Sequence, residues 1–291
     1  MQPGTLLHRF AERTERLSTL DTFAAPLARA TKGAVRRTRL KPLLSGSWLG
    51  HPLHPLATDA VIGSWTMAAL LDLRRGQDSE DAARTLVGFG ILAAVPTAAS
   101  GASDWADTPD ARVRRMGVVH AASNVVALGL NVGSYLARRA GRRSAGARLT
   151  ATSAVPLTIG GFLGAHMAYA RGAGVSRTAF DEQIADWTSI EGSGFSGRDD
   201  WSEASVRGLR VLAHSGEVHE RPRVVAARCT HCGSDLVVDA SGFSLRCPGD
   251  ESVFRVEDGA VLEGPAATPI PIFETRSVAS GGIEVRSPGA A

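Results

Sequence analysis

The residues with the clearest potential for chemistry lie close together near the end of the chain. All three cysteines fall within a short stretch, at Cys229, Cys232 and Cys247. Three clustered cysteines in a chain of 291 residues cannot build a disulfide framework, so they indicate a site for a metal ion or a metal cluster. Asp250 follows Cys247 by three residues, as Cys232 follows Cys229. This C-x-x-C…C-x-x-D spacing is typical of zinc-binding loops.

A second set of candidates is formed by histidines in or beside long apolar stretches of the first half, at His51, His54, His120 and His166. Imidazole binds haem iron and transition metals, and ionisable groups at membrane depth are functional candidates. We therefore consider a b-type haem or a transition metal on these histidines. The alternative is a hydrogen-bond network, with Asn124 one turn after His120, that only fixes helix packing.

The first half contains four apolar stretches, and each is close to the about 20 residues that a bilayer requires. Their succession, with arginine-rich connections, predicts a bundle of four spans. The pairs Gly129 with Gly133 and Gly160 with Gly164 have the spacing of close helix packing, and predict a homo-oligomer through small-residue faces. The predicted spans are residues 55–73, 84–103, 116–137 and 150–170.

The positions of His120 and His166 within their spans predict a common depth. Each lies about four residues from the same end of the bundle, roughly 6 Å below the interface at 1.5 Å per residue. We expect the two rings to face each other, with His51, His54 and Asp59 close by.

Charge is distributed unevenly along the chain. Residues 1–175 carry 21 Lys and Arg against 11 Asp and Glu, whereas residues 176–291 carry 11 against 18. The acidic second half excludes a basic nucleic-acid-binding tail, and we expect no nucleic-acid partner. Nine basic residues before the first span predict a cytoplasmic N-terminus, although five arginines between spans three and four argue against it. An even number of spans returns the C-terminus to the cytoplasm, which predicts a multi-pass protein of the cell membrane in contact with lipid.

Residues 1–49 form a basic segment without a long apolar core. Large apolar residues recur there at helical spacing among the arginines, which predicts an amphipathic helix on the membrane surface. The alternative is a solvated tail. The apolar residues of this pattern are Leu6, Phe10, Leu17, Leu20 and Leu27.

The second half has a different pattern. Residues 176–202 are interpreted as a linker, and residues 203–288 contain short β-rich runs separated by Gly, Asp, Ser and Pro. This spacing predicts a small all-β sandwich or barrel, and a domain of this size gains stability from a bound metal or cluster.

Four blocks of the first half resemble a known family. They are GHPLHPLATDAVIGSW at 50–65, SGASDW at 100–105, RRMGVVHAASNVVAL at 114–128 and GFLGAHMAYARGAGV at 161–175. In this order they are similar to the bacterial membrane family called domain of unknown function 2231. The resemblance covers residues 50–175 and implies a four-span membrane module without an established activity.

The second half resembles a Rieske domain, in which C-x-H and C-x-x-H loops hold a [2Fe–2S] cluster. The corresponding loops are CTHCGSDL at 229–236 and CPGDESVF at 247–254, followed by DG at 258–259, GPA at 264–266 and PIPIFETR at 269–276. The resemblance implies Cys229, His231 and Cys247 as cluster ligands. The second histidine of the family falls at Asp250, which makes this carboxylate the candidate fourth ligand.

Three interpretations of this departure stay open. The cluster binds with Asp250 or another group as fourth ligand; the fold persists without a cluster; or Cys229, Cys232, Cys247 and Asp250 bind zinc. The sequence thus predicts a multidomain protein, with an all-α four-helix transmembrane bundle at 50–175 followed by a small all-β Rieske-like domain.

The predicted function is that of a membrane-anchored electron carrier with a [2Fe–2S] cluster at the cytoplasmic face, serving a redox partner protein rather than acting as a stand-alone catalyst. The alternative is a degenerate Rieske fold, without a cluster or with zinc, that acts as a membrane-tethered binding or scaffold module.

Overall fold

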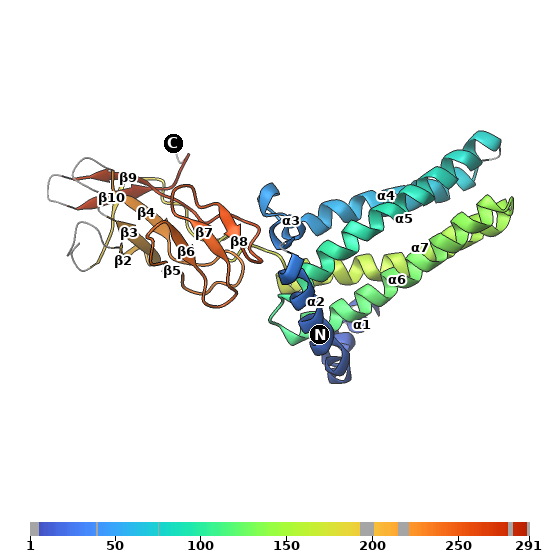
Figure 1. Cartoon of the computed structure of the whole chain (residues 1–291), viewed down its shortest axis with the longest axis horizontal. Helices are drawn as coiled ribbons and strands as arrows, with labels where there is room; N and C mark the ends of the chain where they lie inside the picture. Colours follow the sequence, from blue (N-terminus) through green and yellow to red (C-terminus); the bar gives the residue numbers. More distant parts are fainter. Residues whose placement is uncertain are drawn as a thin grey trace. The chain divides into compact units, whose positions relative to one another are not determined.

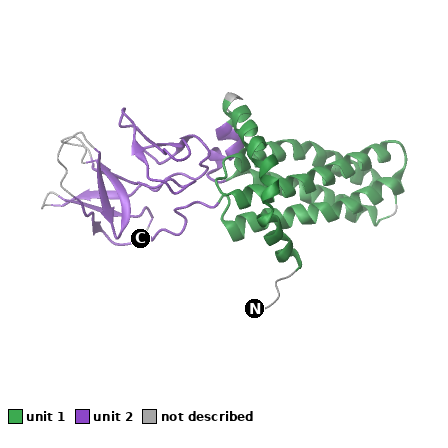
Figure 2. Ribbon diagram, turned by 90° about the horizontal axis from the view of Figure 1, so that it is seen from below, with its two compact units in different colours: residues 1–40, 52–174 green, residues 41–51, 175–291 purple. Residues whose placement is uncertain are grey.

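The structure, a computed structural model, describes residues 6–38, 40–74, 76–192, 201–214, 221–278 and 282–289 (Figure 1). It divides into two compact units, which are coloured separately in Figure 2. The helical unit comprises the described residues of 1–40 and 52–174, and the β unit comprises those of 41–51 and 175–291.

Four long helices dominate the helical unit and correspond to the four predicted apolar stretches. Helix α4 packs along α5, and α6 packs along α7, so that two helical hairpins lie side by side (Figures 1 and 2). The hairpin connections are short, and Gly141 supplies the left-handed backbone (φ 71°) that turns the chain before α7. The helices are α4 (Leu53–Asp72), α5 (Gln77–Ala106), α6 (Ala111–Arg139) and α7 (Arg143–Ala165), which continues as the π-helical turn His166–Ala170.

Of the helices in the described residues, α5 and α6 are long and apolar enough to cross a membrane. The surface of the helical unit is also that expected of a membrane protein, because large apolar side chains on its helices point outward while several polar side chains are buried. The outward side chains include Met67 and Leu70 of α4, Phe89, Leu92 and Val95 of α5, Val125, Val126 and Leu136 of α6, and Val155 of α7. The buried polar ones include Ser100, Ser103, Asn131, Ser134, Thr150 and Ser153.

A buried ion pair joins the two hairpins near their connections. The Arg138 guanidinium donates to both carboxylate oxygens of Asp72, at 2.8 and 2.5 Å, and both side chains are almost fully buried. Such a two-pronged pair is directional, so it fixes α4 against α6. The sequence pattern places Arg138 in the connection between two spans, but the structure shows that it is buried in the helical unit.

The segment before α4 is helical over its described part. Helix α1 (Leu6–Arg16) buries Ala11, Thr14 and Glu15 and packs against α6, while Leu6 and Phe10 remain exposed. A short 3-10 turn (Ser18–Leu20) leads into α2 (Asp21–Thr38), which contacts α5 and α6.

The β unit contains three antiparallel sheets, with strand orders β1-β10-β9, β2-β3-β4 and β5-β6-β7-β8. Helix α3 (Lys41–Ser45) and a 3-10 turn (Ser47–Leu49) also belong to this unit. The strands are β1 (Thr188–Ser189), β2 (Trp201–Val206), β3 (Leu209–His214), β4 (Arg223–Ala226), β5 (Val237–Val238), β6 (Ser244–Arg246), β7 (Val253–Arg255), β8 (Val261–Glu263), β9 (Glu274–Ser277) and β10 (Ile283–Arg286).

Part of the predicted linker belongs to this β unit. Ile184 is fully buried in its core, and β1 pairs with β10. Residues 193–200 of the linker lie outside the described residues.

The sheet of β2, β3 and β4 has a core on each face, which explains why residues 224–227 form a continuous apolar run. Val224 and Ala226 face one core together with Phe273, whereas Val225 and Ala227 face the other together with Phe254. Because strand side chains alternate between faces, only a strand buried on both sides is apolar at every position. The core that contains Phe254 also contains Cys229 and Cys247, so the first residue of each cysteine loop is fixed by packing.

Candidate metal centre

The first cysteine loop, residues 229–234, follows β4 and folds back on itself. The N–H of Cys229 donates to the carbonyl of Ser234 at 2.8 Å, and the N–H of Gly233 donates to the carbonyl of Cys229 at 3.0 Å. Gly233 has a φ of 80°, a left-handed conformation that glycine adopts without steric cost. The turn brings the backbone N–H of Cys232 to the Cys229 sulfur.

The second cysteine loop, residues 247–252, repeats this geometry between β6 and β7. The N–H of Cys247 donates to the carbonyl of Ser252 at 2.8 Å, and the N–H of Glu251 donates to the carbonyl of Cys247 at 3.0 Å. Glu251 takes the left-handed position with a φ of 68°, which is uncommon for a residue with a side chain. Asp250 therefore occupies the position in the second loop that Cys232 occupies in the first.

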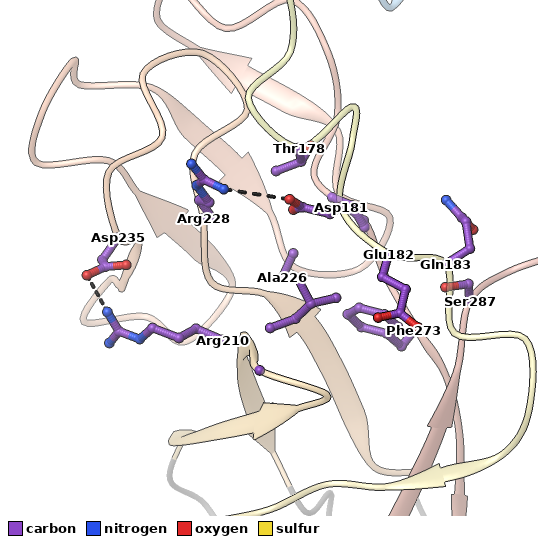
Figure 3. A pocket seen from close by; sticks show the side chains of 13 residues that line it. Thr178, Asp181, Glu182, Gln183, Arg210, Ala226, Arg228, Asp235, Phe273 and Ser287 are labelled. Atoms are coloured by element: carbon purple, nitrogen blue, oxygen red, sulfur yellow. Dashed lines mark hydrogen bonds and ion pairs between the residues drawn. The ribbon is translucent and has the colours of Figure 1, made fainter.

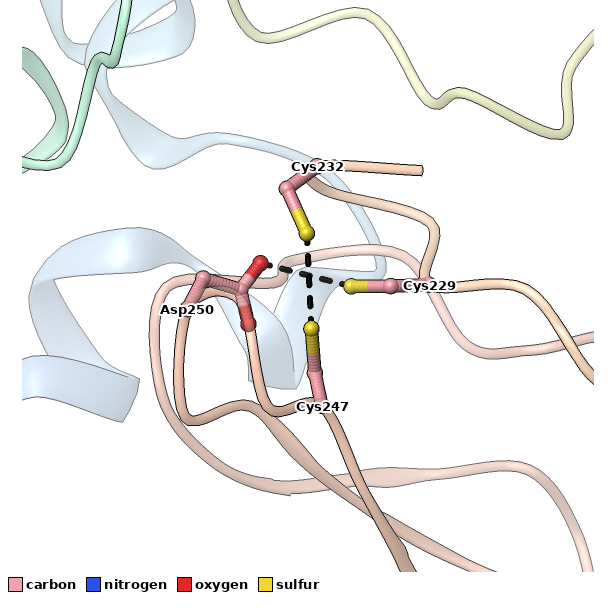
Figure 4. Close-up of side chains that lie close together, drawn as sticks. All are labelled: Cys229, Cys232, Cys247 and Asp250. Carbon is pink, nitrogen blue, oxygen red and sulfur yellow. Dashed lines mark hydrogen bonds between the residues drawn. The ribbon is translucent and has the colours of Figure 1, made fainter. Parts of the chain in front are cut away.

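The four side chains at these equivalent positions converge on one point (Figure 4). The Cys229 thiol donates to Asp250 Oδ2 at 3.3 Å, and the sulfurs of Cys232 and Cys247 are also 3.3 Å apart. One ligand atom from each residue lies within 4.8 Å of the others. Thiolates arranged as a tetrahedron around zinc, at about 2.3 Å each, are roughly 3.8 Å apart, so this group fits a single ion.

Burial is the largest influence on the pKa of the Cys229 and Cys247 thiols of this site. Burial raises the pKa of the Cys229 thiol, and burial raises that of Cys247 to about 12. Backbone N–H groups of Cys232 and Asp250 face the sulfurs of Cys229 and Cys247 respectively, and oppose these shifts. N–H groups aimed at sulfur stabilise a thiolate once a cation is present.

Asp250 is held as a carboxylate by its neighbours. Burial alone would raise its pKa, but hydrogen bonds from the His231 ring and the Ser252 N–H, both at 2.8 Å, hold the pKa well below its usual value. His231 thus contacts Asp250 rather than completing the group of four, and its side chain is 23% exposed. A histidine that orients a ligating carboxylate is a common feature around metals.

Close approach of the two loops depends on Gly249. A Cβ atom at this position would lie 2.5 Å from Ser234 Oγ and 3.3 Å from Cys232 Sγ. Cys232 and Ser234 therefore occupy the space that a side chain at this position would need.

A third segment, residues 264–268, covers both loops. The Ala266 N–H donates to Ser252 Oγ at 3.2 Å, and Thr230 Oγ1 donates to the carbonyl of Thr268 at 2.7 Å. Gly264, at a φ of 95°, passes so close that a Cβ would lie 2.5 Å from Ser252 Cα. This contact gives the GPA block a packing role.

The helical unit can be compared with known protein families. Residues 50–177 match DUF2231, a family described as predicted membrane protein. The match confirms the membrane-family resemblance of the first half and ends before the cysteine loops. No curated protein matches the chain.

Within the DUF2231 helices, two predicted histidines meet. The rings of His54 and His120 are 6.1 Å apart between centroids. His54 Nδ1 contacts the Thr97 carbonyl at 2.9 Å, and His120 bonds the Gly160 carbonyl through Nδ1 (2.7 Å) and Asn124 through Nε2 (3.1 Å).

These contacts leave neither ring nitrogen of His120 free for iron. Its ring also lies against α7, because a Cβ at Gly164 would be 3.2 Å from it, and a Cβ at Gly101 would be 2.6 Å from the His54 ring. The close packing does not fit a haem on His120 and favours the helix-packing role. His51 belongs to the β unit.

His166 has a different partner from the predicted one. Its Nε2 donates to Glu15 Oε1 at 3.1 Å, and Arg171 donates to both oxygens of the same carboxylate at 2.8 and 2.5 Å. Burial would raise the pKa of Glu15, but these hydrogen bonds outweigh it and lower the pKa. Glu15, which the sequence pattern does not single out, therefore ties α1 to the end of the DUF2231 helices.

A separate cavity of about 280 Å³ lies in the β unit (Figure 3). Four of its charged residues pair with each other, since Arg210 pairs with Asp235 and Arg228 with Asp181. No cysteine or histidine is among the residues that line it. We therefore assign the chemistry to the cysteine loops.

Proposed function

We propose that this protein is a membrane-anchored electron carrier, in which the DUF2231 helices form the anchor and the two cysteine loops hold an iron centre. The observation that carries the proposal is the convergence of Cys229, Cys232, Cys247 and Asp250 within 4.8 Å. When iron is bound, such a group supplies one-electron transfer between partner proteins, since iron held by thiolates changes its charge by one.

The Rieske-like character of the β unit is part of this proposal. It is supported by two cysteine loops with the same backbone hydrogen bonds, and by a third segment that covers them at the GPA block. The first loop offers Cys229 and either His231 or Cys232 as ligands, and the second loop offers Cys247 and Asp250.

The anchor is proposed to cross the membrane four times, with both termini in the cytoplasm. Support comes from two helices that meet the length and hydropathy of a span, and from the apolar belt around α4 to α7. Large exposed apolar surfaces are rare on soluble monomers and are expected where lipid covers them. Three free cysteines in one site suit the reducing cytoplasm, where the β unit would then lie.

A second candidate function is that of a redox-inert, zinc-stabilised binding module on the same anchor. The observation that favours it is the composition of the group, because three thiols and one carboxylate in a compact tetrahedral arrangement suit zinc as well as iron. A zinc ion would then contribute to folding of the small domain without transferring electrons.

Metal analysis of the full-length protein separates the two candidates. The protein is extracted from membranes in mild detergent under anaerobic conditions, and its iron, zinc and acid-labile sulfide are measured per chain. The proposal predicts iron and a visible absorption band, both lost in Cys247→Ser and retained in Ser241→Ala, which changes a surface turn. Stoichiometric zinc and a colourless protein would refute electron transfer and support the binding module.

A further inference from the structure

Cys232 and Asp250 are related by the pseudo-symmetry of the two loops. Each residue lies three positions after the first cysteine of its loop, and its N–H faces the sulfur of that cysteine. Each is followed by a left-handed residue, Gly233 or Glu251. Two loops of this kind direct four side chains to a single centre.

From this geometry we infer that Cys232 is a metal ligand, and that the site holds one tetrahedral ion in a set of three cysteines and Asp250. His231 lies outside this set as the donor that orients the Asp250 carboxylate. The inference rests on the proposed metal centre and specifies its ligands and the number of metal atoms.

The distances between the loops argue against a two-iron core in this arrangement. In a Rieske cluster the two cysteines bind one iron and the other two ligands bind the second iron. Cys229 and Asp250 would then belong to different irons, with bridging sulfides between them. They are instead in direct contact, with 3.3 Å between Sγ and Oδ2.

His231 is directed to Asp250 and not to the centre of the group. Its Nδ1 lies 2.8 Å from the same Oδ2 atom that contacts Cys229. Replacement of such a supporting residue typically weakens metal binding 10–100-fold without removing a ligand.

Gly249 provides an independent argument for Cys232. The absence of a side chain there leaves the space in which Cys232 Sγ lies 3.3 Å from Cys247 Sγ. Cys232 also donates to Ser234 Oγ at 3.2 Å, which fixes its rotamer toward the site. The position of the Cys232 sulfur in the site thus depends on the absence of a side chain at Gly249.

Alkylation of the wild-type holoprotein tests the ligand set without any substitution. Iodoacetamide is applied before and after removal of the metal by a chelator, and modified cysteines are identified by peptide mass spectrometry. We expect all three cysteines to be protected until the metal is removed, with one metal atom and no acid-labile sulfide per chain. Modification of Cys232 alone in the holoprotein, with two irons and two sulfides, would overturn the inference and leave electron transfer standing.

Two matched variants extend the test, with Zn²⁺ as the probe in competition with a chelating dye. Cys232→Ser should lower Zn²⁺ affinity by more than about 100-fold, whereas its neighbour His231→Gln should lower it by about 10–100-fold. A larger loss of Zn²⁺ affinity in His231→Gln than in Cys232→Ser would contradict the inference. If Cys232→Ser does not fold, the alkylation pattern of the wild-type protein shows whether Cys232 is a ligand. One zinc per chain with three protected cysteines would support the ligand set and refute electron transfer, while a protein that binds neither metal would refute both.

Discussion

The Cys232 sulfur lies 3.3 Å from the Cys247 sulfur, although the two residues belong to different loops and are 15 positions apart. This contact brings together the two cysteine loops of the candidate metal site. It also predicts how the metal-free protein reacts with an oxidant, because two adjacent thiols are readily oxidised to a disulfide.

We predict that mild oxidation of the metal-free protein with diamide links Cys232 to Cys247. Diamide takes up two electrons and two protons as the sulfur–sulfur bond forms. Peptide mapping should show this link, with Cys229 left as a thiol because it is buried against Asp250. Metal-loaded protein should resist the reaction, and a link that includes Cys229 would contradict the observed arrangement.

Gly249→Ala should weaken metal binding by about 10–100-fold, the size of effect seen for residues around a metal site. The added methyl group would lie 2.5 Å from Ser234 Oγ and would push the first cysteine loop away from the second. Adding Ser234→Ala should recover part of the affinity, since it removes the closest contact. Gly161→Ala serves as control because a Cβ there meets open space; equal loss in this control would indicate a general effect on folding.

Glu15→Gln should loosen α1 from the DUF2231 helices in a pH-dependent manner. The folded-state pKa of Glu15 lies below its ordinary value of 4.5, so its contribution to stability is present above that pH and is lost as the pH falls through the lower folded pKa. The groups that face it are Arg171 and His166, while Arg115 donates to its backbone carbonyl.

At pH 7 we expect a loss of roughly 1–3 kcal/mol in the local stability of α1, measured by hydrogen exchange of its amides in detergent. Wild type and variant should converge only as the pH falls through the lowered folded-state pKa of Glu15. Glu12→Gln is the matched control, because Glu12 lies on the exposed side of the same helix. A difference between wild type and Glu15→Gln that persists undiminished in acid would exclude the proposed ionic contact.

Much of this architecture could be predicted from sequence because it depends on local patterns. The apolar stretches mark α4 to α7, and the cysteine spacing marks both loops, since helix formation and loop geometry are encoded over a few residues. Contacts between distant residues could not be predicted in the same way. Residue counting predicts a common depth for His120 and His166, but it does not predict the rotation of α6, which brings the His120 ring to His54 while His166 contacts Glu15.

Two further features required the three-dimensional arrangement. Glu15 and His166 are 151 positions apart, and no pattern in the sequence connects them. The equivalence of Cys232 and Asp250 is suggested by spacing, but the choice between Cys232 and His231 depends on backbone hydrogen bonds and on the space beside Gly249.

The buried pair of Arg138 with Asp72 bears on the predicted topology. Five arginines within residues 138–148 oppose a cytoplasmic N-terminus, yet Arg138 is buried and Arg143 donates to the Arg74 carbonyl at 2.8 Å. We therefore predict that reporter fusions at residue 145 and at the C-terminus report opposite sides of the membrane, with the C-terminus cytoplasmic. Activity of a periplasm-specific reporter at residue 291 would contradict this orientation.

The central claim is that the cysteine loops carry electrons, and a redox titration of the full-length protein tests it most directly. The anaerobically purified protein is titrated with dithionite while its visible spectrum and its paramagnetic resonance signal are recorded. We expect a metal-based signal that changes with one electron per chain, returns on reoxidation and is lost in Cys247→Ser. A wild-type protein that takes up no electrons, with zinc or no metal bound, would contradict it.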